Sequence, residues 1–225
     1  MQFNSIEFAI FFLAVLTIYF FVPKKARKVW LLLASYIFYM NWNAVYSLLM
    51  LFSTVSTYIC GLIIEKIDSK SKGDIRKIIL TLGILINILI LILFKYQSFI
   101  LTIINDILRN FTIAPLTISL NLLLPVGISF YIFQALGYLI DVYRDDIKAE
   151  KNFITYALFV SFFPQLVAGP IERSKNMLKQ INNIEQINVW NYDRIRSGFI
   201  ITVWGYFIKM VIADRLEIIV DMAFD

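Results

Sequence analysis

The sequence of 225 residues is 60% hydrophobic and 16% charged, and its mean hydropathy is +0.74. Soluble domains carry only about 45–50% apolar residues, so this composition excludes an ordinary soluble domain and predicts an all-α, polytopic bundle of transmembrane helices. The formal net charge is +5, but the basic residues lie in short loops between apolar runs, which favours a role in orienting the chain in a bilayer over nucleic-acid binding.

The first half of the chain contains four apolar runs. We expect membrane helices at Ser5–Val22, Val29–Met40, Ala44–Ile64 and Ile78–Phe94. Because a span needs about 20 residues, the short second run should begin in the basic loop before it or continue past Trp42. Asn87 lies inside the fourth run, where it can form a hydrogen bond between helices or be tolerated as a single amide. The amphipathic run Ser98–Asn110 predicts an interfacial helix, and Phe111–Asn121 predicts a loop.

The second half contains further apolar segments separated by polar stretches. Leu122–Ile140 predicts a fifth membrane helix, and Phe153–Val167 predicts a sixth that is broken at Pro164. Phe199–Val211 is apolar again, and we expect an ion pair between Lys209 and Asp214 near the end of this helix. The pattern therefore predicts about six to seven membrane segments in a single transmembrane domain, residues 1–225.

The run Leu122–Ile140 has two different faces when its residues are placed at about 100° intervals around a helix. Small and polar residues gather on one face: Gly127, Phe130, Gln134, Gly137, Tyr138, Asp141 and Arg144. Apolar residues form the opposite face: Ile128, Ile132, Leu136, Leu139 and Ile140. Because unpaired polar groups are costly in hydrocarbon, we expect the first face to point into protein or a water-filled cavity and the second to meet lipid.

The segment Phe162–Pro170 cannot continue a regular helix. Pro164 and Pro170 each lack a backbone N–H, and Gly169 permits backbone conformations that other residues resist. Irregular backbone at membrane depth is stable only where protein or a water-filled cavity covers it. We therefore expect a broken or re-entrant segment next to an internal cavity.

The distribution of basic residues predicts the orientation of the chain. Loops 23–28, 65–77 and 141–152 contain four, five and three Lys or Arg residues, whereas the alternate loops 41–43 and 95–121 contain none and two. Loops rich in Lys and Arg remain in the cytoplasm. We therefore expect a multi-pass protein of the cell membrane with its N-terminus outside.

Two motifs in this chain resemble the signature of the membrane-bound O-acyltransferase (MBOAT) family. They are LLPVGISFYIFQALGYLIDVYRDD, which ends at Asp146, and FPQLVAGPIERS, which ends at Ser174. The resemblance is greatest to the bacterial branch that O-acetylates alginate and other exported polysaccharides. Shorter matches in the family's order extend it over essentially the whole chain: Met1–Ser5, Ala34–Tyr39, Phe94–Tyr96 and Lys209–Asp214.

The resemblance implies an O-acetyltransferase whose acyl donor, acetyl-CoA or a carrier-linked acyl group, enters from the cytoplasm. The acceptor would be a polysaccharide such as an alginate-like polymer, reached directly or through a partner acetyltransferase outside the membrane. In this family a histidine is taken as the base, family members are longer, and this chain contains no histidine. We therefore expect it to correspond to the N-terminal half of such an enzyme, with no catalytic residue of its own and no activity alone.

The resemblance also implies a substrate tunnel, whose walls this part of the chain would build. The residues expected to line it are Gln134, Asp141, Tyr143, Arg144, Gln165, Gly169, Pro170 and Arg173. The two arginines, on the cytoplasmic side, would meet a phosphorylated donor. The charged residues Asp141, Arg144 and Arg173 are equally compatible with side chains that only reach the membrane edge.

The residues by themselves leave other functions open. The sequence contains no Ser nucleophile elbow and no phosphate-binding Gly loop. With no histidine and only Cys60, we expect no zinc or other metal site. A transporter or channel would use the same polar groups and the broken segment as a permeation path. An inactive truncated fragment is the third alternative.

Overall fold

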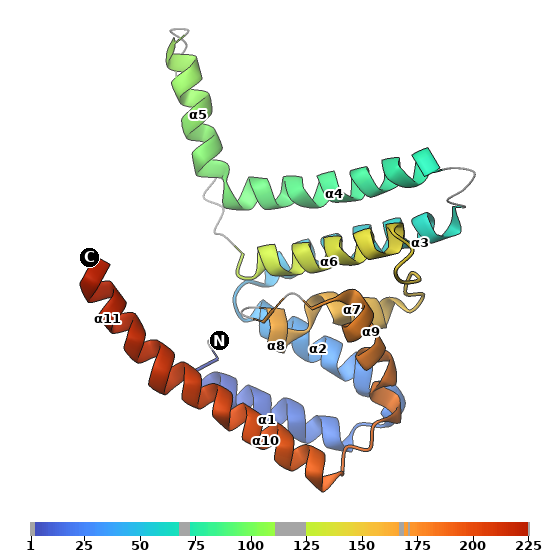
Figure 1. Cartoon of the computed structure of the whole chain (residues 1–225), viewed down its shortest axis with the longest axis vertical. Coiled ribbons are helices and arrows are strands. Elements are labelled where there is room, and N and C mark those ends of the chain that lie inside the picture. The colour runs from blue at the N-terminus through green and yellow to red at the C-terminus, as the bar shows by residue number, and fades with distance from the viewer. Residues whose placement is uncertain (1–2, 68–72, 111–124, 167–168, 171, 225) are drawn as a thin grey trace. The chain divides into compact units, whose positions relative to one another are not determined.

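The structure, a computed structural model, describes residues 3–67, 73–110, 125–166, 169–170 and 172–224. Every regular element in these ranges is a helix, which confirms the predicted all-α class (Figure 1). The predicted loop Phe111–Asn121 and the predicted helix start at Leu122 lie outside the described residues. Contacts divide the chain into two units, Met1–Trp30 with Asn183–Asp225 and Leu31–Asn182. The expectation of one transmembrane domain stays a prediction.

The first unit begins with α1 (Ile6–Phe21), close to its predicted range. Ser5 caps this helix, because its side-chain oxygen accepts a hydrogen bond of 3.2 Å from the backbone N–H of Phe8. A 3₁₀ turn, η1 (Lys24–Ala26), leads directly into α2 (Arg27–Met40). The second helix therefore begins inside the basic loop, as its short apolar run required.

Buried basic side chains at the start of α2 hold the polar segment that precedes the C-terminal helix. Arg27 donates a hydrogen bond of 2.9 Å to the carbonyl oxygen of Ile187. Lys28 forms an ion pair of 3.3 Å with Glu185, which lies in the 3₁₀ turn η2 (Asn183–Gln186). Charge-assisted bonds of this kind are stronger than neutral ones, so they fix η2 against the start of α2.

The rest of the first unit is a long apolar helix. It consists of α10 (Tyr192–Phe207), the π-helical segment η3 (Ile208–Ala213) and α11 (Asp214–Phe224). None of its described residues is buried. The predicted ion pair between Lys209 and Asp214 is present in η3 and at the start of α11.

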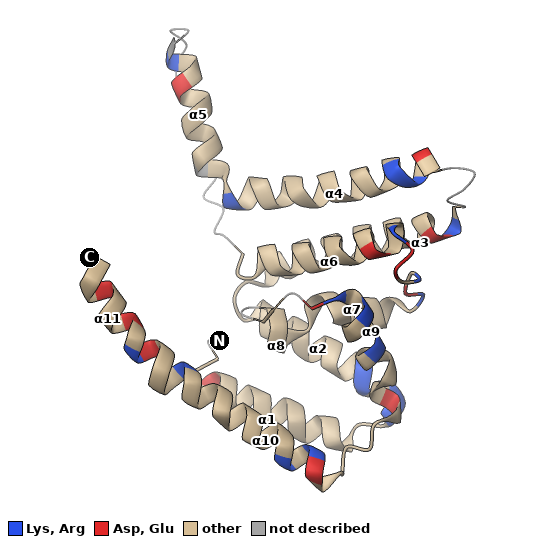
Figure 2. Ribbon diagram, viewed as in Figure 1, with Lys and Arg blue, Asp and Glu red and all other residues tan. Residues whose placement is uncertain are grey.

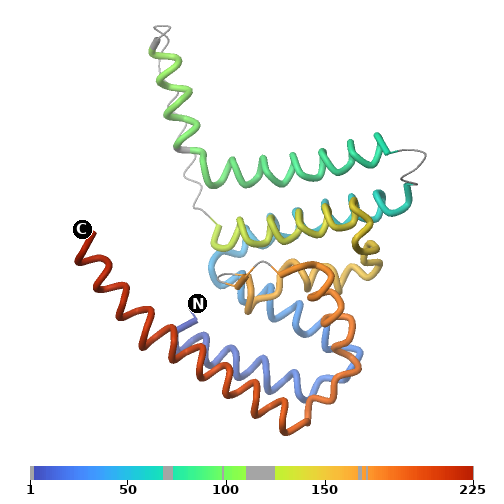
Figure 3. Tube along the Cα trace, viewed as in Figure 1, coloured from blue at the N-terminus to red at the C-terminus, as the bar shows by residue number. Residues whose placement is uncertain are grey.

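Three helices form the centre of the second unit: α3 (Ala44–Lys66), α4 (Gly73–Lys95) and α6 (Ile128–Tyr143). α6 packs along both α3 and α4 (Figures 1 and 3). The other helices of this unit, besides the end of α2, are α5 (Gln97–Asn110), α7 (Phe153–Ser161), α8 (Phe163–Leu166) and α9 (Ser174–Asn182). Its core contains fully buried aromatic side chains: Phe38, Tyr131, Tyr138, Tyr156, Phe159 and Phe163.

Charged residues of the second unit gather where α3 ends, α4 begins and α6 ends (Figure 2). The described parts of the loops that the count of basic residues assigns to the cytoplasm, 65–67, 73–77 and 141–152, therefore lie at one end of these helices. Arg76 and Asp145 join the two loops directly, at 2.7 Å. The arrangement agrees with the predicted alternation of the loops, and the side of the membrane stays a prediction.

Three described helices are long and apolar enough to cross a membrane, by length and composition: Ala44–Lys66, Gly73–Lys95 and Tyr192–Phe224. Three shorter apolar stretches accompany them: Ile6–Phe21, Ile128–Tyr143 and Phe153–Leu166, the last made of α7 and α8. Between two of the long helices, Asn87 of α4 accepts a hydrogen bond from the hydroxyl of Ser53 and donates one of 3.3 Å to Ser56. Of the two alternatives for Asn87, the structure therefore shows the hydrogen bond between helices.

The prediction that one face of the fifth helix meets lipid is wrong. Four of the five residues assigned to that face are buried: Ile128, Ile132, Leu136 and Leu139. The reason is that α6 contacts α3, α4, α7 and α9, so protein covers nearly its whole circumference. Its exposed large hydrophobic side chains are Phe130 and Phe133, at 38% and 45% exposure.

Candidate functional site

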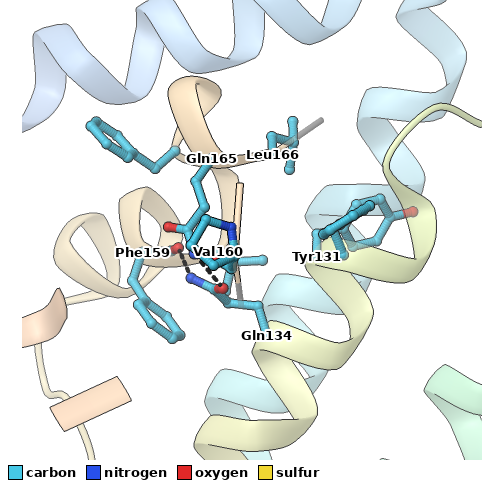
Figure 4. Close-up of a pocket in the computed structure, with 9 residues that line it drawn as sticks. Tyr131, Gln134, Phe159, Val160, Gln165 and Leu166 are labelled. Atoms are coloured by element: carbon cyan, nitrogen blue, oxygen red, sulfur yellow. Dashed lines mark hydrogen bonds between the residues drawn. The ribbon is translucent and has the colours of Figure 1, made fainter. Parts of the chain in front are cut away.

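Two glutamine side chains meet inside the second unit, where α6 faces the break between α7 and α8 (Figure 4). Gln165 Nε2 donates to Gln134 Oε1 at 3.1 Å and to the carbonyl oxygen of Pro170 at 2.6 Å. Gln134 Nε2 donates to the carbonyl oxygen of Phe159 at 3.0 Å and lies 3.4 Å from Met177 Sδ. Because Gln134 is only 6% exposed, these bonds replace the water that its amide loses on burial.

The break between α7 and α8 frees the carbonyl group that Gln134 binds. In a continuous helix the carbonyl oxygen of Phe159 would accept from the N–H of Phe163. The chain leaves the helical region at Phe162, where ψ is 108°, and the N–H of Phe163 donates instead to Ser35 Oγ at 3.2 Å. The Gln134 amide therefore takes the place of a missing backbone donor.

The predicted break is confirmed, but it occurs at Phe162 and not at Pro164. Pro164 lies in the first turn of α8, where a missing N–H leaves no helical hydrogen bond unmade. The ring of Pro164 also restricts φ to values that suit the start of a helix. The proline thus favours a new helix after the break.

Two glycines allow the close approaches around this site. Gly127 has a φ of +73°, the left-handed conformation, just before α6, and a Cβ there would lie 2.6 Å from the carbonyl oxygen of Leu166. A Cβ on Gly169 would lie 2.6 to 2.8 Å from three atoms of Gln165. Any larger residue would force these segments apart.

Gln165 lies between two spaces. A cavity of about 10 Å³, lined by Gln134, Tyr131 and Phe159 among others, has room for about one water molecule. A second pocket of about 270 Å³ is lined by Glu172, Met177 and Gln180 among others. Phe162, Gln165 and Pro170 line both spaces. The expected cavity beside the broken segment is present, but among the described residues it is too small to hold a substrate.

The carboxylate of Glu172 lines the pocket beside this site. The groups bonded to the glutamine pair itself are neutral amides, carbonyls and a thioether. They donate and accept hydrogen bonds but do not exchange protons near neutral pH. Acyl transfer to a hydroxyl requires a base for the hydroxyl proton. The site can therefore orient a polar substrate, and proton transfer has to come from another group. In the part of the chain that the structure describes, no group of three His, Cys, Asp or Glu could hold a metal ion.

The structure brings together four of the eight predicted tunnel residues: Gln134, Gln165, Gly169 and Pro170. Asp141, Tyr143 and Arg144 lie instead at the C-terminal end of α6, and Asp141 is about 10 Å from Gln134 along the helix axis. Arg173 is exposed and directly precedes α9. The charged candidates are therefore separate from the glutamine pair.

Arg76 of α4 organises the end of α6, and sequence reasoning missed it. Its guanidinium donates to both carboxylate oxygens of Asp145, at 2.7 and 3.1 Å, and to the carbonyl oxygen of Tyr143 at 3.1 Å. It also lies 5.6 Å from the centre of the Tyr143 ring. Hydrogen bonding to Arg76 holds the pKa of Asp145 below its usual value. The only signal in the sequence is a cation in the first turn of a helix, where the helix dipole disfavours it.

Comparisons with known proteins confirm the resemblance to bacterial O-acetyltransferases. The chain is 36% identical over 225 residues to the protein named "Probable alginate O-acetylase AlgI" of Pseudomonas aeruginosa, and 36% identical to the protein of that name from Azotobacter vinelandii. All of this chain is aligned, with 42% and 44% of those proteins. It is 34% identical to the peptidoglycan O-acetyltransferase of Helicobacter pylori, with 92% of this chain and 43% of that protein aligned.

The matches cover only part of each relative. The chain spans less than half the length of the curated relatives it matches. No family model matches the chain, and no solved structure matches it. The similarity identifies this chain as a relative of bacterial O-acetyltransferases.

Proposed function

We propose that the protein containing this sequence is a membrane-bound O-acetyltransferase that transfers acetyl groups to hydroxyls of an exported polysaccharide. One observation carries the proposal: relatives named for two different acceptors, alginate and peptidoglycan, share one reaction. Similarity to both over 92% or more of this chain supports the shared reaction better than either acceptor.

The acceptor we propose is an alginate-like polymer, modified directly or through a partner acetyltransferase outside the membrane. The donor is acetyl-CoA or a carrier-linked acetyl group that enters from the cytoplasm. With the N-terminus outside, the charged end of α3, α4 and α6 faces that donor (Figure 2). Arg144 is exposed there and provides a cation for a phosphorylated donor.

The glutamine pair forms part of the wall of the substrate path in this proposal. Gln165 Nε2 is shared between Gln134 and Pro170, so rotation of one side chain breaks both bonds. That rotation would join the cavity of about 10 Å³ to the pocket of about 270 Å³. The amides released by it can bind the hydroxyl or carbonyl groups of a substrate.

The base for the acceptor hydroxyl is a histidine outside this sequence in this proposal, because the sequence contains none. Histidine is the side chain whose unperturbed pKa of about 6.5 suits proton transfer near neutral pH. The described residues would then bind and orient the substrates, and the 225-residue chain alone would not transfer acetyl groups.

The experiment measures transfer of radiolabelled acetyl from acetyl-CoA to polysaccharide in membranes that contain the full natural protein. Transfer above that of membranes without the protein is the expected result. Gln165→Leu should reduce transfer, because it removes the shared amide at nearly constant volume, whereas Phe133→Leu, exposed on α6, should not. Uptake of a solute without acetyl transfer would favour a transporter instead.

A further inference from the structure

The first unit contains an apolar groove between α1 and α10 that has no part in the site described above. Its volume is about 630 Å³, within the range of roughly 300–1,000 Å³ that is typical of ligand pockets. The lining residues recur at helical spacing on one face of each helix, and they include Ile6, Leu13, Leu16, Ile195, Phe199 and Val203. Each of these six side chains is exposed.

Contacts close the groove at both ends and leave its middle open. The hydroxyl of Tyr206 donates to the carbonyl oxygen of Phe3 at 2.9 Å, and at the other end the rings of Phe20 and Trp190 lie 5.0 Å apart. In between, Gly198 contributes no side chain, and a Cβ there would meet no atom within 4 Å. The two helices therefore enclose a space that they do not fill.

The dimensions of the groove fit a lipid chain better than a helix. From Ile6 to Phe20 it is about 21 Å long, and one acyl chain crosses about 15 Å, half of the hydrocarbon core. A helix about 10 Å in diameter and of this length would occupy roughly 1,600 Å³, whereas the space free of protein atoms in the groove is about 1380 Å³. A helix would also have to break the contacts that close both ends.

One end of the groove is basic. Arg194 lines it there, is exposed, and has no carboxylate partner in an ion pair among the described residues. The exposed Lys24 and Lys25 follow the last turn of α1. Trp190 at this end is typical of the membrane–water interface, where lipid phosphates lie. Basic pockets between membrane helices bind anionic lipid headgroups.

We propose that this groove binds an anionic phospholipid, with one acyl chain between α1 and α10 and the phosphate at Arg194. The apolar walls remove the chain from contact with other lipids, and the arginine forms charge-assisted hydrogen bonds to the phosphate oxygens. The site depends on residues of the first unit alone. It is therefore independent of acetyl transfer and of the glutamine pair.

The test uses the full natural protein in vesicles of phosphatidylcholine with phosphatidylglycerol that carries a photoreactive group on one acyl chain. After illumination, mass spectrometry of peptides should place the label on α1 and α10. Gly198→Leu fills the groove without a clash and should abolish this labelling. Gly205→Leu, equally open but not among the residues that line the groove, is the matched control and should retain it.

Two further measurements separate the headgroup from the chain. Arg194→Gln should lower labelling by phosphatidylglycerol about five-fold, the effect of one basic residue at an anionic surface. Ala9→Leu fills the groove from the opposite wall and should repeat the Gly198→Leu result.

Three results would overturn the proposal. One is equal labelling of Gly198→Leu and Gly205→Leu. Another is labelling by a phosphatidylcholine probe as strong as that by phosphatidylglycerol, since the arginine would then select no anionic lipid. The third is efficient disulfide crosslinking of two copies through Phe199→Cys, which would show that a second copy covers the groove.

Discussion

Arg76 and Asp145 are 69 residues apart in the sequence, and their side chains meet at 2.7 Å where α4 begins and α6 has just ended. The two partners differ in environment: the side chain of Arg76 is 4% exposed and that of Asp145 is 66% exposed. The buried arginine also bonds the carbonyl oxygen of Tyr143, which lacks a partner in its own helix. Arg76 is thus both an ion-pair partner and the cap of α6.

This pair predicts a dependence of stability on pH. Arg76 lowers the pKa of Asp145 in the folded state, so the pair stabilises the fold fully above the unfolded pKa of about 4 and loses that effect as pH falls through the lower folded value. Asp145→Asn should therefore lower the melting temperature at pH 7 and make little difference at pH 2. A melting-temperature difference that is the same at both pH values would contradict the prediction.

Gln134→Leu should destabilise the protein by about 1–2 kcal/mol, because the change leaves the buried Phe159 carbonyl without its donor and removes one of the two acceptors of the Gln165 amide. Thermal unfolding in detergent measures the effect. Phe133→Leu is the control, since the side chain of Phe133, next to Gln134 in the sequence, is 45% exposed. Ile132→Leu, the natural choice if that face met lipid, is unsuitable because Ile132 is 0% exposed. Equal losses in the two variants would mean that the amide bonds contribute nothing.

Gly169→Ala should lower stability by about 1–3 kcal/mol, because the added Cβ would lie 2.6 Å from Gln165 Cγ and 2.7 Å from its Cα. Gly137→Ala provides the comparison on α6. A Cβ there meets no atom within 4 Å, and alanine is the better helix former, so this variant should be neutral or more stable. Thermal unfolding measures the stability of both variants. A Gly169→Ala variant more stable than the Gly137→Ala variant would show that the close approach at Gly169 does not constrain the residue there.

The predicted orientation can be tested with cysteines in described loops. In a Cys60→Ser background, Asn41→Cys should react with an impermeant thiol reagent on intact cells, and Asp146→Cys should react only after the membrane is opened. The two positions flank opposite ends of α3 and α6, and α3 with 23 residues is about 34 Å long. Labelling of Asp146→Cys alone in intact cells would reverse the orientation.

Local patterns predicted the helices well because most helix ends here depend on nearby residues. Ser5 caps α1 by a bond to Phe8, and the break after α7 follows from a proline two residues beyond it. The prediction that one face of the fifth helix meets lipid was wrong, because a helical wheel compares only the residues of one helix with each other. Lipid and a neighbouring apolar helix present the same apolar surface, so Ile132 could not be assigned to either.

The candidate site was only partly predictable for a similar reason. Polar residues in an apolar run identified Gln134 and Gln165, since such groups need partners. Their partners are the Phe159 carbonyl, which lies in α7 just before the break, and Met177, which lies in the polar helix α9. No periodicity in the sequence indicates that these three segments meet.

The length of the last helix has a consequence for where its charges lie. Tyr192–Phe224 contains 33 residues, about 50 Å, whereas the hydrocarbon core is about 30 Å thick. A steep crossing would therefore place roughly 20 Å of this rod in the headgroup layers or in water. η3 and the start of α11 carry Lys209, Asp214, Arg215 and Glu217. Because these charges favour hydration, we expect the helix to leave the hydrocarbon core of the membrane at η3. α11 would then lie outside the hydrocarbon core.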